Sequence, residues 1–395
     1  MEILTFPLLV ILGYLPVLII GYSLKITVVR ALLIYVWHTI FVLIYFLYVS
    51  YYGGDAIDYF NKAKKINFND SIGNIGIILI INFLYEVFNF SILSVSVIFG
   101  ITGAVGLLFF DSALQAAVSH KEKWLKIFAT MIIFLPSVSF WTAGLGKEPL
   151  SFLSTCLSLW AALKLNKRLP FMIFSIMLML AVRPHIAGIM LIALFLGVFF
   201  SNKIFLHKKI FIIILLIFSV IILVPFALNY SGMGTNLNID SILSYIQLRQ
   251  SYNMDGGGAI DISKMSLPEQ LFAFMFRPFI FDIHSMFAAA AAFDNLILFV
   301  LFILGAWSML KGMRSDLGEN RIFMWAYTLT AWTVLAVTTA NLGIALRQKW
   351  MFAPMLIFLF ISVIGRRKLA PSISKSDSHS SRAASLPPPD VCKQT

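Results

Sequence analysis

Charged side chains are scarce in this sequence. Only 12% of its 395 residues are Asp, Glu, Lys or Arg, whereas 60% are hydrophobic. Soluble domains average about 25% charged residues, so this composition excludes an ordinary water-soluble globular protein. Repeated apolar runs of about 20 residues have the length that crosses a bilayer as an α-helix. The sequence therefore predicts an all-α polytopic membrane protein.

Cysteine and acidic residues are also few. Cys156 and Cys392 are the two cysteines, which excludes a disulfide framework, and no Cys/His spacing indicates a zinc site. The net charge of +12 would suggest nucleic acid in a soluble protein. In a membrane protein such an excess collects on cytoplasmic loops and sets topology. We therefore expect the protein to reside in a lipid bilayer and not to bind nucleic acid.

About 11 segments (10–12) have the length and apolarity of membrane spans. They are residues 3–22, 31–50, 91–110, 127–145, 148–165, 169–182, 186–200, 210–229, 290–310, 322–340 and 350–365. Residues 72–90 are a further apolar segment, but they include Glu86, and an intramembrane glutamate is costly. We expect this segment to form a re-entrant or interfacial helix that does not cross the membrane.

Basic residues give the chain a direction. If the C-terminus is cytoplasmic, four other basic loops also fall inside, as the positive-inside rule requires. These loops carry Lys121, Lys123 and Lys126; Lys164, Lys167 and Arg168; Lys203, Lys208 and Lys209; and Lys311, Arg314 and Arg321. This reading predicts a bundle over residues 1–368 in a bacterial inner membrane, with outer loops at 51–90 and 230–290. Residues 369–395 are rich in Ser and Pro, which predicts a disordered cytoplasmic tail.

Polar side chains then gather on the predicted outer face. They are Asp55, Asp58 and Tyr59 in "YYGGDAIDYF"; Lys147 and Glu148 in "GLGKEPLSF"; Arg183 and His185 in "AVRPHIAGI"; Arg277 and His284 in "FRPFIFDIH"; and Arg347 in "NLGIALRQKW". Arginines at this face run against the positive-inside bias. A bound phosphate would account for them, because a guanidinium binds phosphate through two parallel hydrogen bonds.

Simpler explanations exist for each of these residues. Lys147 and Glu148, with Pro149 after them, are ordinary helix-start chemistry. Arg183 and Arg347 can be snorkelling residues at the membrane interface. Asp55 and Asp58 can be a solvated acidic loop balanced by neighbouring lysines. If "DAIDYFNKA" is helical, however, Asp55, Asp58 and Tyr59 lie on one face, where a carboxylate can accept a proton from a hydroxyl.

The outer loop with Asp-Ala-x-x-Tyr at 55–59 resembles the first periplasmic loop of GT-C-type membrane glycosyltransferases. The motifs "PSVSFWTAGLGKE", "RPH", "FRPFIFD" and "NLGIALRQKW", between about residues 55 and 355, resemble multi-pass proteins of bacterial polysaccharide gene clusters, among them Wzy-type repeat-unit polymerases. Two predicted spans precede the acidic loop here, whereas the GT-C pattern usually has one. The resemblance implies a polyprenyl-phosphate- or pyrophosphate-linked sugar donor and a catalytic acidic residue, which matches Asp55.

The resulting hypothesis is glycosyl transfer or repeat-unit polymerisation in O-antigen, capsule or exopolysaccharide synthesis. Asp55 or Asp58 would act as the base, and Arg183, Arg277, Arg347 and Lys147 would hold the phosphate. Glu148, Tyr59, His185 and His284 complete the expected substrate site. A divalent metal would fit if Asp55, Asp58 and acidic residues of loop 230–290 converge. The partners implied are the lipid-linked saccharide and other polysaccharide-assembly proteins.

Three alternatives remain at the level of sequence. A polymerase can rely on arginines and a histidine, without a catalytic carboxylate. A polysaccharide-precursor transporter or flippase would place ionisable residues near the membrane midplane. A scaffold subunit would tolerate the loss of any single outer arginine.

Overall fold

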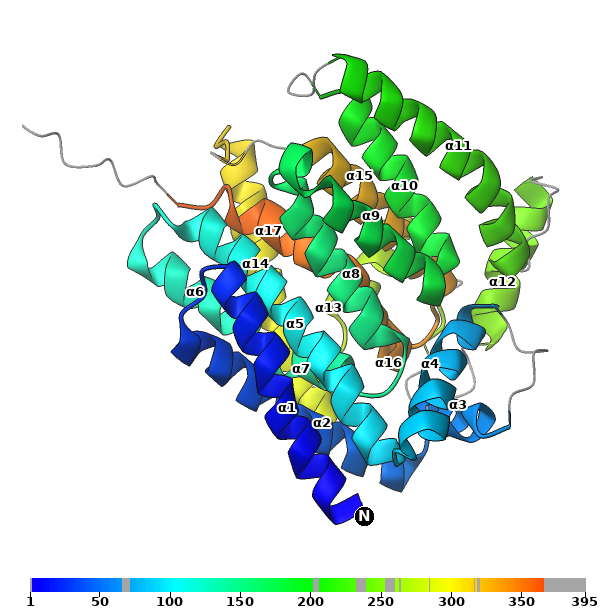
Figure 1. Ribbon diagram of the computed structural model, residues 1–395. Coiled ribbons are helices and arrows are strands. Elements are labelled where there is room, and N and C mark those ends of the chain that lie inside the picture. Colours follow the sequence, from blue (N-terminus) through cyan, green and yellow to red (C-terminus); the bar gives the residue numbers. More distant parts are fainter. Residues whose placement is uncertain are drawn as a thin grey trace, which may run out of the picture.

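The protein is described by a computed structural model over residues 2–65, 72–201, 206–231, 239–252, 260–262, 264–283, 285–315, 317 and 320–365. These residues form α-helices, two short 3₁₀ helices and connecting turns, and no β-strand occurs among them (Figure 1). The predicted all-α helical bundle is confirmed. His284 and the predicted tail lie outside the described residues, as do Gly256–Gly258 of the large predicted loop.

The first helices line one side of the bundle. They are α1 (Glu2–Ser23), α2 (Val28–Tyr52), α3 (Asp55–Ala63), α4 (Ile72–Phe88) and α5 (Ile92–Val118). The middle of the chain forms α6 (Lys123–Ile133), α7 (Pro136–Ala143), α8 (Lys147–Ala162), α9 (Leu165–Val182), α10 (Pro184–Phe199), α11 (Leu206–Ser231) and α12 (Ile239–Tyr252). The last part forms α13 (Leu267–Phe276), η1 (Ile280–Asp282), α14 (Met286–Leu310), α15 (Arg321–Thr338), α16 (Leu342–Gln348), η2 (Lys349–Met351) and α17 (Ala353–Ile361).

Every predicted span falls largely on helix. Within the described residues, six helices are long and apolar enough to cross a membrane, or seven if the pair Leu342–Met351 and Ala353–Ile361, bent by 63°, counts as one span. Among the other predicted spans, α8 and α10 are helices of 16 residues each, and the total of eleven stays a prediction. The six are distributed around the bundle, and α1, α9 and α14 turn many large apolar side chains outward, as lipid-facing helices do.

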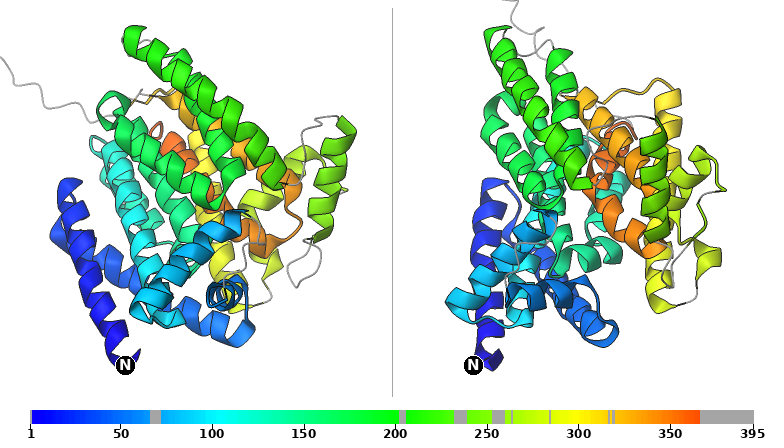
Figure 2. Two further views of the ribbon diagram at one scale, coloured as in Figure 1. Left: turned by 45° about the vertical axis from the view of Figure 1, so that its right-hand side comes forward. Right: turned by 90° about the vertical axis from the view of Figure 1, so that its right-hand side faces the viewer.

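The core is centred on α17 and α5. Every residue of α17 is buried, and it packs against α5, α8, α14 and α15. Small residues allow α5 to approach its neighbours closely. A Cβ on Gly103 would lie 2.1 Å from the carbonyl oxygen of Thr142, so only glycine fits at this crossing. Figure 2 shows α11 and α12 at the margin of the bundle, away from this core.

The loops sort onto two ends of the bundle. At one end, the side chain of Asn320 donates to the carbonyl of Ala162 at 2.7 Å, and Arg321 donates to Ser362 Oγ at 2.8 Å. Lys121 binds the carbonyl of Ser362 at 2.7 Å. We call this the basic end. These contacts bring three of the predicted basic loops together with the end of α17, and the assignment of this end to the cytoplasm remains a prediction.

Helices α3 and α4 lie at the opposite end. A buried apolar cluster there joins Val49 at the end of α2, Phe60 of α3, Ile81 of α4 and Val95 at the start of α5. Because α2 ends and α5 begins in this one cluster, α3 and α4 leave and return at the same end (Figure 1). The expectation that residues 72–90 do not carry the chain across the bundle agrees with this geometry.

Candidate functional site

Asp55 stands at the first position of helix α3. Gly53 and Gly54 end α2 with φ values of 73° and 135°, which glycine adopts readily, and α3 starts directly after them. Ala56, Tyr59, Phe60 and Ala63 form the buried face of α3. The side chain of Asp55 is 54% exposed, so its carboxylate is held at a fixed place and remains accessible from outside.

Arg347 brings the last part of the chain to Asp55. It lies at the end of α16, a short helix whose first turn is capped by the side chain of Asn341. Arg347 Nη1 donates to Asp55 Oδ2 at 2.6 Å, and Arg347 Nε lies 3.9 Å from Glu148 Oε1. The two partners of the first contact are 292 positions apart in sequence. One guanidinium therefore links two carboxylates from different parts of the fold.

Glu148 also pairs with Arg183. Arg183 Nη2 donates to Glu148 Oε1 at 2.9 Å, and the two side chains are only 11% and 14% exposed. Glu148 lies in the first turn of α8, which begins at Lys147, so the expected helix start is present. The ion pair comes in addition to that role. Asp55, Arg347, Glu148, Arg183 and Lys147 are hereafter called the outer cluster.

Lys147 has an unusual environment within the outer cluster. Burial, and after it the charge of Arg183, lowers the pKa of Lys147 to about 8, despite the opposing influence of Glu148 and Asp55. Its amine therefore changes charge close to physiological pH. Burial also raises the pKa of the nearby Tyr59 hydroxyl, with Asp55 as the next cause. Tyr59 Oη donates to Asn74 Oδ1 at 3.4 Å and stays neutral.

The outer cluster has more positive than negative side chains. With Lys147 protonated it carries three cations and two carboxylates. The helices α3, α8 and α10 begin at Asp55, Lys147 and Pro184, and none of the three has a side-chain cap. Their first-turn N–H groups add the positive end of the helix dipole. The Nε atoms of Arg183 and Arg347 are buried without a hydrogen-bond acceptor in the described part of the chain.

His185 adjoins this cluster as a neutral side chain. Burial, followed by the charges of Arg183, Arg249 and Lys147, lowers the pKa of His185 to about 3. A neutral imidazole can hydrogen-bond a substrate but cannot supply positive charge at physiological pH. Arg249, on α12, was not expected from the sequence, because nothing in its surroundings distinguishes it from an ordinary exposed arginine.

Other expected site residues are not joined to the outer cluster. Asp58 lies on the exposed side of α3 and pairs with Lys62 at 3.0 Å, so the solvated-loop interpretation describes it better than a catalytic role. Arg277 binds Asp282 through two hydrogen bonds, of 3.0 and 2.6 Å, and no contact among the described residues ties it to Arg347. His284 is outside the described residues.

A buried polar network lies beneath the cluster, in the bundle core. Lys349, fully buried and two residues after Arg347, donates to Asn295 Oδ1, and Asn295 Nδ2 donates to the carbonyl of Pro278 at 2.9 Å. The adjacent Asp294 accepts the Ser137 backbone N–H at 2.5 Å and so caps α7. Through Asp294 and Asn295, helix α14 thus contacts both the start of α7 and the segment before α17.

Tyr45 supports the segment that carries Lys147, a role that the sequence did not reveal. It lies on α2, inside a predicted span, where its apolar surroundings gave no functional signal. A Cβ added to Gly144 would lie 2.1 Å from Tyr45 Cε1, so the ring packs directly on the backbone just before Lys147. Gly144 thus lets α2 support the segment that carries Lys147 and Glu148.

The metal hypothesis finds no ligand set in the described residues. No group of three His, Cys, Asp or Glu side chains there is placed to hold a metal ion. Asp261 of the large predicted loop pairs with Lys264 at 3.2 Å. Asp255 lies outside the described residues.

Comparisons with known proteins add no family assignment. No protein-family model, no curated protein and no solved structure matches the chain.

Proposed function

We propose that the protein transfers a sugar, as a glycosyltransferase or repeat-unit polymerase, from a polyprenyl-phosphate- or pyrophosphate-linked donor at the outer face of a bacterial cytoplasmic membrane. The product would be a surface polysaccharide. The observation that carries this proposal is the outer cluster, where an accessible carboxylate lies against an arginine beside three uncapped helix N-termini. Such a site suits a reaction in which a hydroxyl loses a proton while a phosphate leaves.

The cations serve the donor. Arg347, Arg183 and Lys147 would contact the phosphate of the lipid-linked sugar, whose chain lies between helices. As the bond between the anomeric carbon and the phosphate oxygen breaks, the phosphate departs with the electron pair. Fixed positive charge lowers the energy of that developing anion because the charges are already oriented. Glu148, paired with Arg183 at 2.9 Å, holds the guanidinium in place.

Asp55 serves the acceptor. Its Oδ2 is bound to Arg347 in the structure. When a phosphate takes over Arg347, this oxygen is released to accept the proton of the incoming hydroxyl. The acceptor oxygen then bonds to the anomeric carbon, and the proton stays on Asp55.

The decisive experiment compares Asp55→Asn with Asp58→Asn in cells that depend on this protein for their surface glycan. Asp58 is the matched control, because it is a carboxylate three residues away that pairs only with Lys62 among the described residues. We expect D55N to reduce glycan synthesis about 10²–10⁴-fold, the usual contribution of a general base, and D58N to leave it near wild type. Unchanged synthesis in D55N at normal expression would refute the base.

The accumulating lipid-linked intermediate identifies the reaction. Single complete repeat units on lipid would indicate a polymerase, and truncated units would indicate a single-sugar transferase.

A transporter or flippase is the second candidate, and the buried Lys349–Asn295–Asp294 network favours it. Transporters commonly place ionisable side chains within the membrane, often at helix breaks. Lys349 lies at the bend between Leu342–Met351 and Ala353–Ile361, and Asp294 is buried inside α14. Trapping of lipid-linked saccharide in the inner leaflet, with D55N still functional, would support this candidate over sugar transfer.

A further inference from the structure

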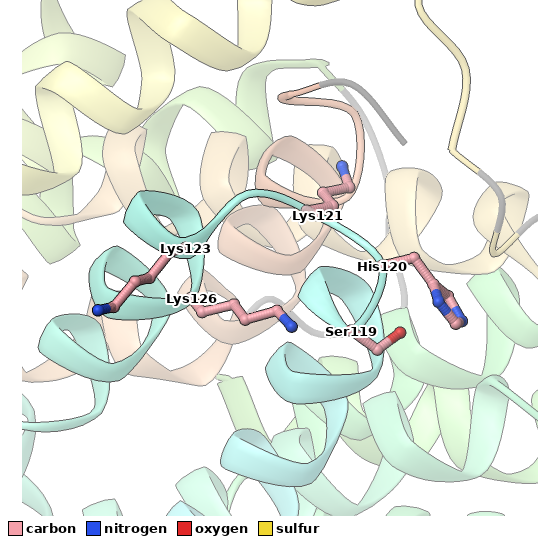
Figure 3. A pocket seen from close by; sticks show the side chains of 5 residues that line it. All are labelled: Ser119, His120, Lys121, Lys123 and Lys126. Carbon is pink, nitrogen blue, oxygen red and sulfur yellow. The ribbon is translucent and has the colours of Figure 1, made fainter. Parts of the chain in front are cut away.

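A pocket opens at the basic end, on the far side of the bundle from the outer cluster. It lies between the end of α5 and the start of α6 and has a volume of about 350 Å³ (Figure 3). The residues that line it are Ser119, His120, Lys121, Lys123 and Lys126. Figure 3 shows Lys126 extending toward the side of Ser119, while Lys123 leaves α6 in the other direction. Among the described residues, no acidic side chain lines the pocket.

The positive charge of Lys123 and Lys126 has no acidic partner among the described residues. No salt bridge joins either amine to a carboxylate within the described ranges. The nearest acid in sequence, Glu122, is engaged elsewhere and accepts the Trp124 indole N–H at 2.7 Å. Lys121 is different, because its amine is bound by the carbonyls of Ile361, Ser362 and Ile364. Two cations of the described chain are therefore open to an external anion.

An apolar stripe begins at this pocket. Trp124, Ile127 and Met131 lie at i, i+3 and i+7 on α6 and are 44%, 59% and 39% exposed. In a membrane-spanning helix such a stripe faces lipid, and tryptophan favours the level of the headgroups. Lys123 directly precedes Trp124, where the stripe starts, so an occupant that uses both should carry an anionic head and apolar chains.

We propose that the pocket binds the phosphate headgroup of an anionic phospholipid, with its acyl chains along the α6 stripe. A free phosphate ion would use the lysines but leave the stripe without a role. Helix α6 also starts without a side-chain cap at Glu122, which leaves first-turn N–H groups to favour an anion. The proposal concerns the basic end alone and does not depend on sugar transfer.

The test measures lipid retention by the purified full-length protein. The protein is exposed to vesicles of phosphatidylglycerol or of phosphatidylcholine, extracted in mild detergent, and examined by native mass spectrometry. We expect the wild type to retain phosphatidylglycerol in preference. Because each lysine near a membrane surface contributes about 1 kcal/mol to attraction of anionic lipid, K123Q/K126Q should bind it about 30-fold more weakly.

The matched control is K164Q/K167Q. These lysines are exposed at the same end, near the α8–α9 connection, and lie outside the pocket. The control removes the same charge and should retain phosphatidylglycerol like the wild type. Equal retention of the two lipids by the wild type, or equal loss in both variants, would overturn the proposal. So would displacement of phosphatidylglycerol by millimolar inorganic phosphate, which would identify an ion site instead.

Discussion

The two ends of the bundle hold their cations in opposite ways. At the basic end, cations bind backbone carbonyls where helices finish. Lys121 donates to the carbonyl of Ser362 at 2.7 Å after α17, and Arg168 donates to the carbonyl of Trp160 at 2.6 Å near the end of α8. In the outer cluster, Arg183 and Arg347 bind side-chain carboxylates from distant segments, beside the first turns of α3, α8 and α10.

The difference lies in the groups that the cations reach. A cation that binds the last carbonyls of a helix satisfies orphan acceptors and meets the negative end of the dipole, so it is stable without a further partner. Two cations at the basic end secure the fold in this way. Arg183 and Arg347 also stand at the ends of helices, α9 and α16, but their guanidinium groups pair with Glu148 and Asp55 in the first turns of α8 and α3. Lys147 adds a third cation to these two pairs.

Glu148→Gln should have the largest effect on stability. It leaves the Arg183 guanidinium, whose side chain is 11% exposed, without its carboxylate. Removing one partner of a buried ion pair costs about 3–5 kcal/mol, because the other charge stays buried and uncompensated. Denaturant unfolding of the purified protein in detergent measures this loss. The double variant E148Q/R183Q should recover much of it, and a double variant as unstable as E148Q would contradict the pairing.

Arg347→Gln should have the largest effect on activity relative to stability. Loss of one fixed charge that stabilises a leaving phosphate costs about 10²–10³-fold in rate. Its counterpart at the basic end is Arg321→Gln, which removes contacts with Ser362 Oγ and the carbonyl of Leu359. Glycan synthesis, normalised to protein amount, should fall in R347Q and stay at the wild-type level in R321Q. Equal losses would mean that both arginines act only through the fold.

Lys147 predicts a pH dependence of anion binding. Its pKa of about 8 lies below the ordinary lysine value of 10.5, so the amine is charged below pH 8 and loses its charge as the pH rises through that value. Binding of a short-chain polyprenyl phosphate should weaken up to about tenfold between about pH 7 and pH 9. The stability of the folded protein, in contrast, should rise with pH between about pH 8 and pH 10.5. In that range the unfolded chain still holds the proton that the folded chain has lost.

Lys147→Arg is the control for this pH dependence. An arginine stays charged throughout the range, so its binding curve should be flat. A wild-type curve that matches that of K147R would show that Lys147 does not titrate in the site.

Lys62→Ala should have the smallest effect. Its ion pair with Asp58 spans one turn of α3 and both side chains are well exposed, at 39% and 57%. Exposed pairs of this kind contribute about 0.3–0.5 kcal/mol. Neither glycan synthesis nor the unfolding midpoint should move measurably. A loss of activity in K62A would return Asp58 to the functional site.

Local sequence predicted the elements of the site better than their contacts. The Lys147–Pro149 segment indicated a helix start, and α8 begins there. The helix considered for "DAIDYFNKA" is present as α3. The sequence treated Asp55 and Asp58 alike, because helical spacing places both near the loop. Only the folded chain separates them, since Arg347 reaches Asp55 and Lys62 neutralises Asp58.

The amino-acid sequence by itself determined an all-α membrane bundle, because 60% of its residues are hydrophobic and many stand in runs long enough to cross a bilayer as helices. The sequence also predicted which loops are basic and share one face of the bundle. The tertiary structure alone decided that Arg347 meets Asp55 across 292 residues and that Asp294 caps α7. Hydropathy and helical spacing act over a few turns, whereas ion pairing between distant segments depends on how helices pack.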